Sequence, residues 1–92
     1  YNTLGLVFYR QGDYNNARIN FEKAVALKKL ALGKICNESF ATAHFNLALT
    51  LDELGDPKAA KEYEIAERMY RELNLIDDAE TAKEYRHNML NP

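Results

Sequence analysis

Apolar residues recur every three or four positions through most of the chain, which is the spacing that places them on one face of an α-helix. The pattern stops at Gly12, starts again after Asp13, and stops at Gly33 and Gly55. Glycine readily adopts the left-handed backbone that ends many helices, and aspartate caps the start of the next helix. These signals predict five helices, over residues 1–11, 14–32, 38–54, 57–74 and 78–90.

The fourth and fifth helices have recognisable start signals. Asp56 can cap the fourth helix, and Pro57 would stand at its first position, where the missing N–H of proline is tolerated. Asp77 and Glu80 have the spacing of a capping box, with aspartate in place of serine or threonine. No stretch alternates apolar and polar residues with the period of a strand, so the sequence predicts an all-α fold.

The helix boundaries also repeat along the chain. Gly12 returns as Gly55, and Gly33 returns as Asn74, each after an interval of about 40 residues. Such a period is typical of stacked helix pairs, because a single pair cannot bury its apolar face alone.

The residues inside each pair resemble the tetratricopeptide repeat. The first copy reads Tyr1-x-x-Leu4-Gly5-x-x-Phe8, then Gly12, Ala17-x-x-x-Phe21 and Ala24, with tyrosine in place of the usual tryptophan. The second copy reads His44-x-x-Leu47-Ala48-x-x-Leu51, then Gly55, Ala59-x-x-x-Tyr63 and Ala66. The long second helices resemble the extended variants of kinesin light chains and spindle-orientation adaptors more than the standard repeat of about 34 residues.

This resemblance implies a right-handed α-solenoid of antiparallel helix pairs, with about two repeats and a C-terminal helix. We expect one domain over residues 1–92, in which residues 1–36 and 37–75 are the repeats. Residues 76–92 would form a cap or the first helix of a third repeat. Because Tyr1 already lies inside the apolar pattern, we expect the chain to be a fragment of a longer protein.

Gly5 lies inside the first predicted helix, where glycine costs roughly 1 kcal/mol relative to alanine. It stands at the small-residue position of the repeat. We expect it to let the second helix of the pair approach closely, and we expect Ala48 to do the same in the second pair.

Tetratricopeptide arrays are similar in binding partner peptides on a concave face, which the first helix of each pair lines. The resemblance therefore predicts a scaffold or adaptor that binds a peptide or helix of another protein. The residues that it projects onto the concave face are Asn2, Leu6, Tyr9, Arg10, Thr42, Phe45, Asn46, Leu49, Asp52 and Glu53. The last helix would add Lys83 and Arg86.

Alternatives remain open both for these residues and for the function. Each residue could belong to the solvated face of a structural helix. Four of them, however, are large apolar residues, which is more than a surface without a binding role usually carries: Leu6, Tyr9, Phe45 and Leu49. Phe45 could instead pack against the following helix. The open ends of the array could also serve self-association into a homo-oligomer, and the repeats could form a peptide-sensing regulatory domain.

One subfamily holds a peptide's C-terminal carboxylate with lysines, asparagines and an arginine. Only Asn46 matches that pattern here, since the first-repeat positions carry Asn2 and Leu6. The sequence therefore disfavours this mode of binding. Asn46 could still bond the backbone of an extended peptide, because an amide both donates and accepts.

The overall charge argues against two classes of partner. The formal net charge is −2 and the sequence pI is about 5.7, so the chain lacks the basic excess that nucleic acids and anionic membranes attract. No apolar run approaches the ~18 residues of a membrane-spanning helix. The single cysteine, Cys36, fits a reducing compartment. We expect a cytoplasmic protein that binds neither nucleic acid nor membrane.

The sequence holds no set of residues typical of catalysis. His44 and His87 lie far apart, and neither has the spacing of a metal-ligand motif, so we interpret His44 as a packing residue. Cys36 has no histidine near it and is interpreted as a half-buried apolar residue. We expect no enzyme activity, no metal and no cofactor.

Overall fold

The computed structural model describes residues 2–32 and 37–91. Gly33 and Cys36, with the helix end and the half-buried thiol predicted there, lie outside the described residues. The described part consists of helices and turns, without a strand, which confirms the all-α class and the predicted number of helices. The helices are α1 (Asn2–Arg10), α2 (Tyr14–Leu32), α3 (Glu38–Glu53), α4 (Ala59–Glu72) and α5 (Ile76–Leu90).

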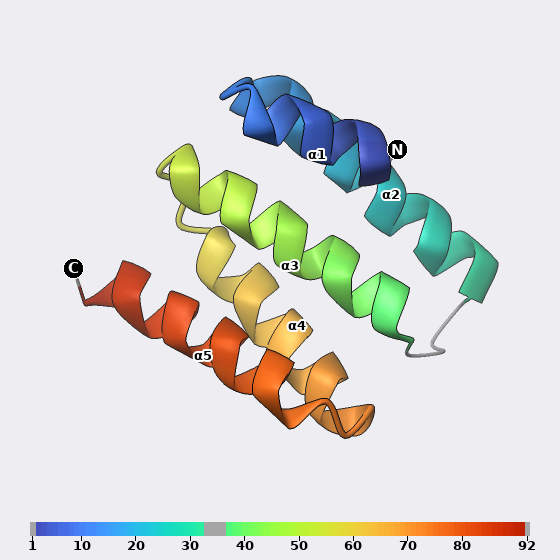
Figure 1. Cartoon of the computed structure of the whole chain (residues 1–92), viewed down its shortest axis with the longest axis vertical. Coiled ribbons are helices and arrows are strands. Elements are labelled where there is room, and N and C mark those ends of the chain that lie inside the picture. The colour runs from blue at the N-terminus through green and yellow to red at the C-terminus, as the bar shows by residue number, and fades with distance from the viewer. Residues whose placement is uncertain (1, 33–36, 92) are drawn as a thin grey trace.

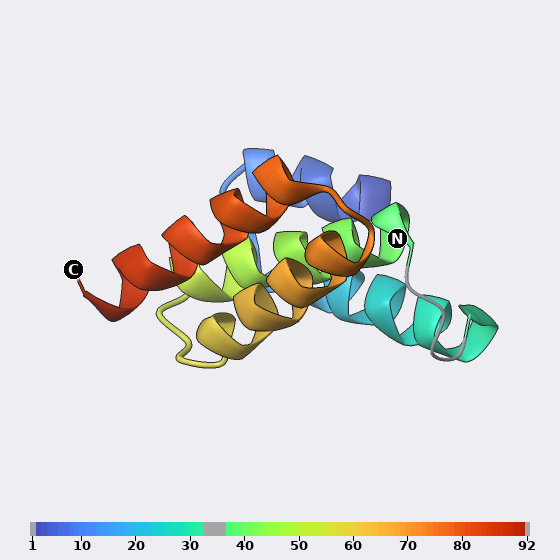
Figure 2. The same cartoon turned by 90° about the horizontal axis from the view of Figure 1, so that it is seen from below.

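Each helix packs against the next helix along the chain and runs antiparallel to it (Figure 1). The central helix α3 packs on α2 on one side and on α4 on the other, so it joins the pair of α1 and α2 to its own partner α4. In the view of Figure 2, α1 and α5 lie above α3, whereas α2 and α4 lie below it. Helices α1, α3 and α5 therefore share one side of the molecule, and α3 lies deepest on that side.

Helices α1, α3 and α4 end in the same kind of turn. Gly12, Gly55 and Asn74 all have a left-handed backbone, with φ of 79°, 71° and 62°. At the end of α1, the N–H of Asp13 donates to the carbonyl of Phe8 at 2.9 Å, and α3 and α4 end with the same bond across five residues. This pattern satisfies carbonyl groups that the helix itself leaves unpaired. Gly12 and Gly55, which the sequence predicts to be equivalent, share this geometry. The predicted repeat partner of Asn74 is Gly33, which lies outside the described residues.

Two predicted helix starts are confirmed by side-chain caps. The Oδ1 atom of Asn37 accepts a hydrogen bond from the N–H of Phe40 at 2.8 Å, which caps α3. At the start of α2, the Oδ1 atom of Asp13 accepts from the N–H of Asn16 at 3.3 Å. Both acceptors satisfy an N–H of the first turn, so the caps act as the sequence predicts.

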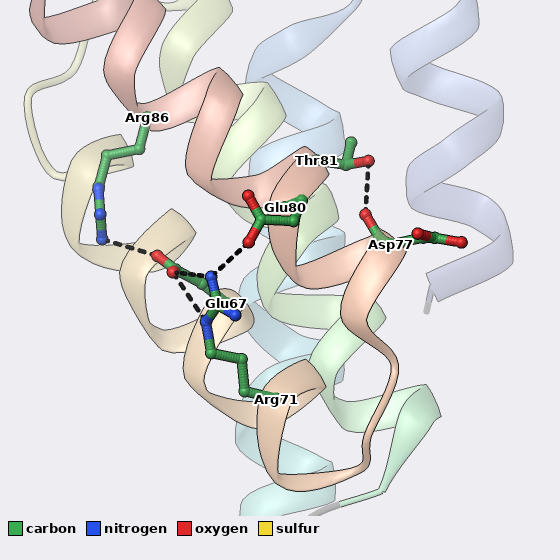
Figure 3. A network of polar contacts seen from close by, with 6 residues as sticks. All are labelled: Glu67, Arg71, Asp77, Glu80, Thr81 and Arg86. Atoms are coloured by element: carbon green, nitrogen blue, oxygen red, sulfur yellow. Dashed lines mark hydrogen bonds and ion pairs between the residues drawn. The ribbon is translucent and has the colours of Figure 1, made fainter.

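The prediction of a capping box at Asp77 and Glu80 is wrong. Helix α5 already includes Ile76, and the residue before it, Leu75, has no side-chain acceptor. The Glu80 carboxylate does not turn back to the helix start, because it pairs with Arg71 of α4 instead (Figure 3). A contact between helices has therefore replaced the predicted local one.

The start of α4 also differs from the prediction. Asp56 does accept a hydrogen bond from the N–H of Lys58 at 2.9 Å, but the regular helix begins at Ala59. The N–H of Ala59 donates to the carbonyl of Asp56, and that of Ala60 to the carbonyl of Pro57, in each case across three residues. Pro57 thus opens a tighter turn that precedes the α-helix.

Two clusters of buried side chains form the core. The first joins α2, α3 and α4, and its members are Ala17, Phe21, Leu47, Ala48, Leu51, Ala59 and Tyr63. The second joins α3, α4 and α5, and its members are Ala41, Ala66, Tyr70, Ala79 and Ala82. Leu4, a residue of the repeat pattern, lies outside both clusters and keeps 48% of its surface exposed. The core therefore centres on α3 and α4, and the outer side of α1 is uncovered at Leu4.

Gly5 confirms the predicted close approach of α1 and α2. A Cβ atom at position 5 would lie 2.7 Å from Cε1 of the Phe21 ring, which is nearer than packed carbon atoms come. Phe21 is fully buried, so its ring has little room to move away. The cost of a glycine in α1 is offset because the aromatic ring occupies the space of the missing side chain.

We predict that Gly5→Leu lowers the free energy of unfolding by about 1 to 3 kcal/mol, because the new side chain overpacks the site beside Phe21. Thermal unfolding followed by circular dichroism measures the loss. The control is Thr3→Leu, which adds the same residue at an exposed position of the same helix. An unchanged melting temperature for Gly5→Leu would contradict the packing described here.

Candidate functional site

Partly exposed apolar side chains gather where α1, α3 and α5 share one side of the molecule. Leu6, Tyr9, Phe45, Leu49 and Met89 pack on the first core cluster without being fully covered. Tyr85 of α5 contacts the rings of Phe45 and Tyr63 and keeps 44% of its surface exposed. We call this surface the α1/α3/α5 face, and its six residues are Leu6, Tyr9, Phe45, Leu49, Tyr85 and Met89.

Aromatic rings join the helices beneath this face. The fully buried Tyr63 reaches up from α4, and its ring centre lies 5.8 Å from that of Phe45 and 5.9 Å from that of Tyr85. The Tyr63 and Tyr85 rings are stacked, with an angle of 15° between their planes, whereas Phe45 meets Tyr85 edge to face. Rings at these distances attract one another beyond the effect of burial alone. One ring from α4 thus positions the rings of α3 and α5.

Two carboxylates lie at the C-terminal end of α3, next to this aromatic group. The hydroxyl of Tyr63 donates to Oδ2 of Asp52 at 3.0 Å. Burial, and then this hydrogen bond, raise the pKa of Tyr63 far above its usual value. Burial also raises the pKa of Tyr9, with the charge of Glu53 as the next cause. Asp52 and Glu53 therefore add negative charge close to the tyrosine hydroxyls.

The structure uses several of the predicted concave-face residues inside the fold. The hydroxyls of Thr42 and Tyr70 lie 2.9 Å apart and share a hydrogen bond between α3 and α4. Asn46 is buried, with 8% of its surface exposed. Phe45 packs against α4 and α5, as one alternative from the sequence allowed. These three side chains offer less contact area to a partner than their helix positions suggest.

The remaining predicted residues lie nearer to solvent. Arg10 and Glu53 are exposed, while Leu6, Tyr9, Leu49 and Asp52 are partly covered. The side chain of Asn2 lies outside the described part of the chain. The predicted contact with a partner stays a prediction for the whole set.

The sequence analysis missed the contribution of α5. It proposed Lys83 and Arg86 for this helix, but Arg86 is directed to Glu67 of α4 and Lys83 lies among the polar residues of the outer surface. The residues of α5 that reach the face are Tyr85 and Met89. Their spacing of four positions was the available signal, since it places two large apolar groups on one side of a helix.

An ion-pair network holds α5 on α4 (Figure 3). Arg71 binds Oε2 of Glu67 through two nitrogens at 3.1 and 3.0 Å, and it also reaches Glu80 at 2.9 Å. Nη1 of Arg86 binds the other oxygen of Glu67 at 3.1 Å. The Glu67 side chain is only 14% exposed, and a charge with so little water around it needs partners. Arg71 of α4 and Arg86 of α5 compensate it. The network fixes the helix that carries Tyr85 and Met89.

His44 forms a second polar contact between helices. Its Nδ1 atom lies 2.6 Å from Oε2 of Glu62, and its ring packs 5.0 Å from that of Phe40. His44 is buried, in agreement with its interpretation as a packing residue. Among the described residues, no group of three or more His, Cys, Asp or Glu side chains is placed to hold a metal ion.

Two hollows on the surface lie away from the α1/α3/α5 face. One is lined by residues of α4 alone, from Glu64 to Glu72, and the other by residues of α5 alone, from Glu80 to Asn88. A hollow whose walls come from a single helix is the open space between neighbouring side chains.

Within the described ranges, the helices are too short or too polar to cross a membrane.

We predict that Tyr63→Phe lowers the free energy of unfolding by about 1 kcal/mol at neutral pH, because Asp52 loses its hydrogen-bond donor. The folded chain favours the neutral hydroxyl, so this contribution is complete below the usual pKa of 10.0 and declines as the pH rises above it. Urea unfolding at several pH values should therefore show a steeper alkaline loss for the wild type than for Tyr63→Phe. Parallel curves would contradict the bond.

We predict a different pH dependence for the ion pairs of α5. The hydrogen bond from Arg71 lowers the pKa of Glu80 below its usual value of 4.5. The stabilisation is therefore present above that pH and is lost as the pH falls through the lowered pKa. Glu80→Gln should show a flatter loss of stability in acid than the wild type. Glu84→Gln, an exposed change on the same helix, is the control and should follow the wild type.

The turns, the packing of Gly5 and the paired helices agree with one family. The family model described as tetratricopeptide repeat matches residues 1–65, which cover α1, α2, α3 and the first half of α4. Comparisons with curated proteins and with solved structures found no match. Because the match spans well over half of the sequence, the chain belongs to the tetratricopeptide repeat family.

Proposed function

We propose that this chain is an interaction scaffold that binds a peptide or helix of a partner protein on its α1/α3/α5 face. Tetratricopeptide repeats generally mediate protein–protein interactions, and the family is a non-enzymatic scaffold type. The observation that carries the choice of face is its set of six apolar side chains, which come from three helices and remain partly open to solvent.

The chemistry of the face suits a protein partner. Tyrosine offers a large apolar ring with a polar tip, and it is enriched where proteins bind one another. Tyr9 and Tyr85 provide such rings from α1 and α5, while Leu49 of α3 is partly exposed and packs on the first core cluster. Helices α1 and α5 lie above α3 in Figure 2. Because the rings rest on the buried core, a partner would meet a surface that is already ordered, which lowers the entropic cost of binding.

Self-association is the second candidate, and a separate observation favours it. Val7 of α1 and Ile19 of α2 are 44% and 41% exposed, and Leu4, at the uncovered side of α1, is 48% exposed. Apolar groups at the end of a repeat array are normally covered by the next repeat. A second copy of the chain would cover them in the same manner.

We predict that Tyr9→Ala combined with Leu49→Ala abolishes capture of the partner, because it removes contact area from both α1 and α3. A pull-down from cell lysate, read by mass spectrometry, compares this variant with the wild type. The matched control is Ile19→Ala combined with Leu27→Ala, which truncates two exposed apolar residues of α2. Circular dichroism must show equal helicity for all three proteins.

Each outcome separates the candidates. Proteins captured by the wild type and by the control, but not by the Tyr9 and Leu49 variant, would support the α1/α3/α5 face. Equal capture by that folded variant would exclude the face. Capture of nothing except the chain itself, lost in the Ile19 control, would favour self-association.

A further inference from the structure

The proposed face leaves the chemistry of its partner open, and the charges at one end of it restrict the choice. Resting on the proposed function, we infer that the partner segment is apolar and basic. Its apolar residues cover the α1/α3/α5 face, and an arginine or lysine binds at the end of α3, against Asp52 and Glu53 and over the tyrosine rings.

The end of α3 differs from the ends of the other helices. Helices α1, α2, α4 and α5 each carry a basic residue in the last turn, which complements the partial negative charge of a helix C-terminus. Helix α3 has no basic residue there and instead carries Asp52 and Glu53. The two carboxylates and the helix dipole thus add up to a site of negative potential.

The basic side chains of the ion pairs described above bind other carboxylates. None of these four ion pairs involves Asp52 or Glu53. Burial raises the pKa of Tyr9, and the charge of Glu53 is the next cause, so this carboxylate lies close to the Tyr9 ring. Arg10 follows Tyr9 along the chain but belongs to none of these pairs. A cation supplied by a partner would therefore meet two carboxylates that none of these ion pairs occupies.

The aromatic rings beside the acids favour the same kind of group. A guanidinium or ammonium ion is attracted to the face of a tyrosine ring within about 6 Å. Tyr85 remains 44% exposed although its ring stacks on Tyr63, and Tyr9 is partly exposed on the opposite helix. Arginine fits best, because its planar group can stack on a ring and bind a carboxylate through two N–H groups.

The apolar part of the face explains why a basic residue alone would not suffice. Leu6, Leu49 and Met89 offer no polar group, so they would favour apolar neighbours of the basic residue. The charge fixes where the segment lies, and the apolar contacts supply most of the area. A segment with only acidic or only polar residues fits neither the apolar residues of the face nor the carboxylates of Asp52 and Glu53.

The test is selection of phage-displayed random peptides on the whole 92-residue chain, followed by binding of the enriched peptides as synthetic, fluorescently labelled probes. We expect the enriched peptides to share an arginine or lysine beside apolar residues. Replacing that basic residue with glutamine should weaken binding roughly tenfold, the loss typical of a charge-assisted hydrogen bond. Binding of the unchanged peptide should weaken as salt is raised.

Variants of the protein assign the effect to α3. Glu53→Gln and Asp52→Asn should each weaken the basic peptide several-fold and leave its glutamine version unaffected. Asp52→Asn keeps an oxygen that accepts from the Tyr63 hydroxyl, so the fold is retained. The control is Glu64→Gln, which removes the same charge from an exposed position of α4 and should bind as the wild type does.

The remaining outcomes distinguish this inference from the proposed function. Enriched peptides that lack basic residues, but lose binding to the Tyr9→Ala and Leu49→Ala variant, would overturn the inference and support the face. Basic peptides that bind Glu53→Gln and Asp52→Asn as tightly as the wild type would also overturn it. A failure to enrich any peptide, or equal binding to the Tyr9 and Leu49 variant, would count against both.

Discussion

The packing of Tyr63 between three helices is the contact on which the candidate site depends. Its ring is fully buried, it stacks on Tyr85 of α5, and it supports Phe45 of α3 from below. Its hydroxyl meets Asp52 at the end of α3. One side chain of α4 therefore sets the positions of Phe45, Tyr85 and Asp52. The exposed face is ordered because this buried residue supports it from beneath.

Local signals predicted the helices well because the determinants of a helix end are themselves local. Gly12 and Gly55 take a backbone conformation that few other residues tolerate, so their sequence positions mark the turns directly. Gly5 was predictable for a related reason, since a glycine inside a helix calls for a close neighbour. The capping box at Asp77 failed because Arg71, a residue of another helix, binds Glu80. A pattern of four residues contains no information about such a partner.

The candidate site was predictable only in outline. The resemblance to the tetratricopeptide repeat projected Tyr9 and Leu49 onto the concave face, but it also treated Thr42 as a residue free for a partner. The hydrogen bond between Thr42 and Tyr70 depends on how α3 and α4 cross, which the sequence does not specify by itself. Tyr85 was missed for a similar reason, because the family match ends at residue 65, before α5, and the contact of Tyr85 with Phe45 arises from tertiary packing.

The helices of the molecule are stacked in the order of the chain. Because each helix packs chiefly on its neighbours along the chain, stability divides into units that open in sequence from either end. Detachment of α5 alone would leave α2, α3 and α4 packed, yet it would remove Tyr85 and Met89 from the α1/α3/α5 face. A partner that spans α1 and α5 would therefore act as a clamp, and its binding would suppress fraying at both ends simultaneously.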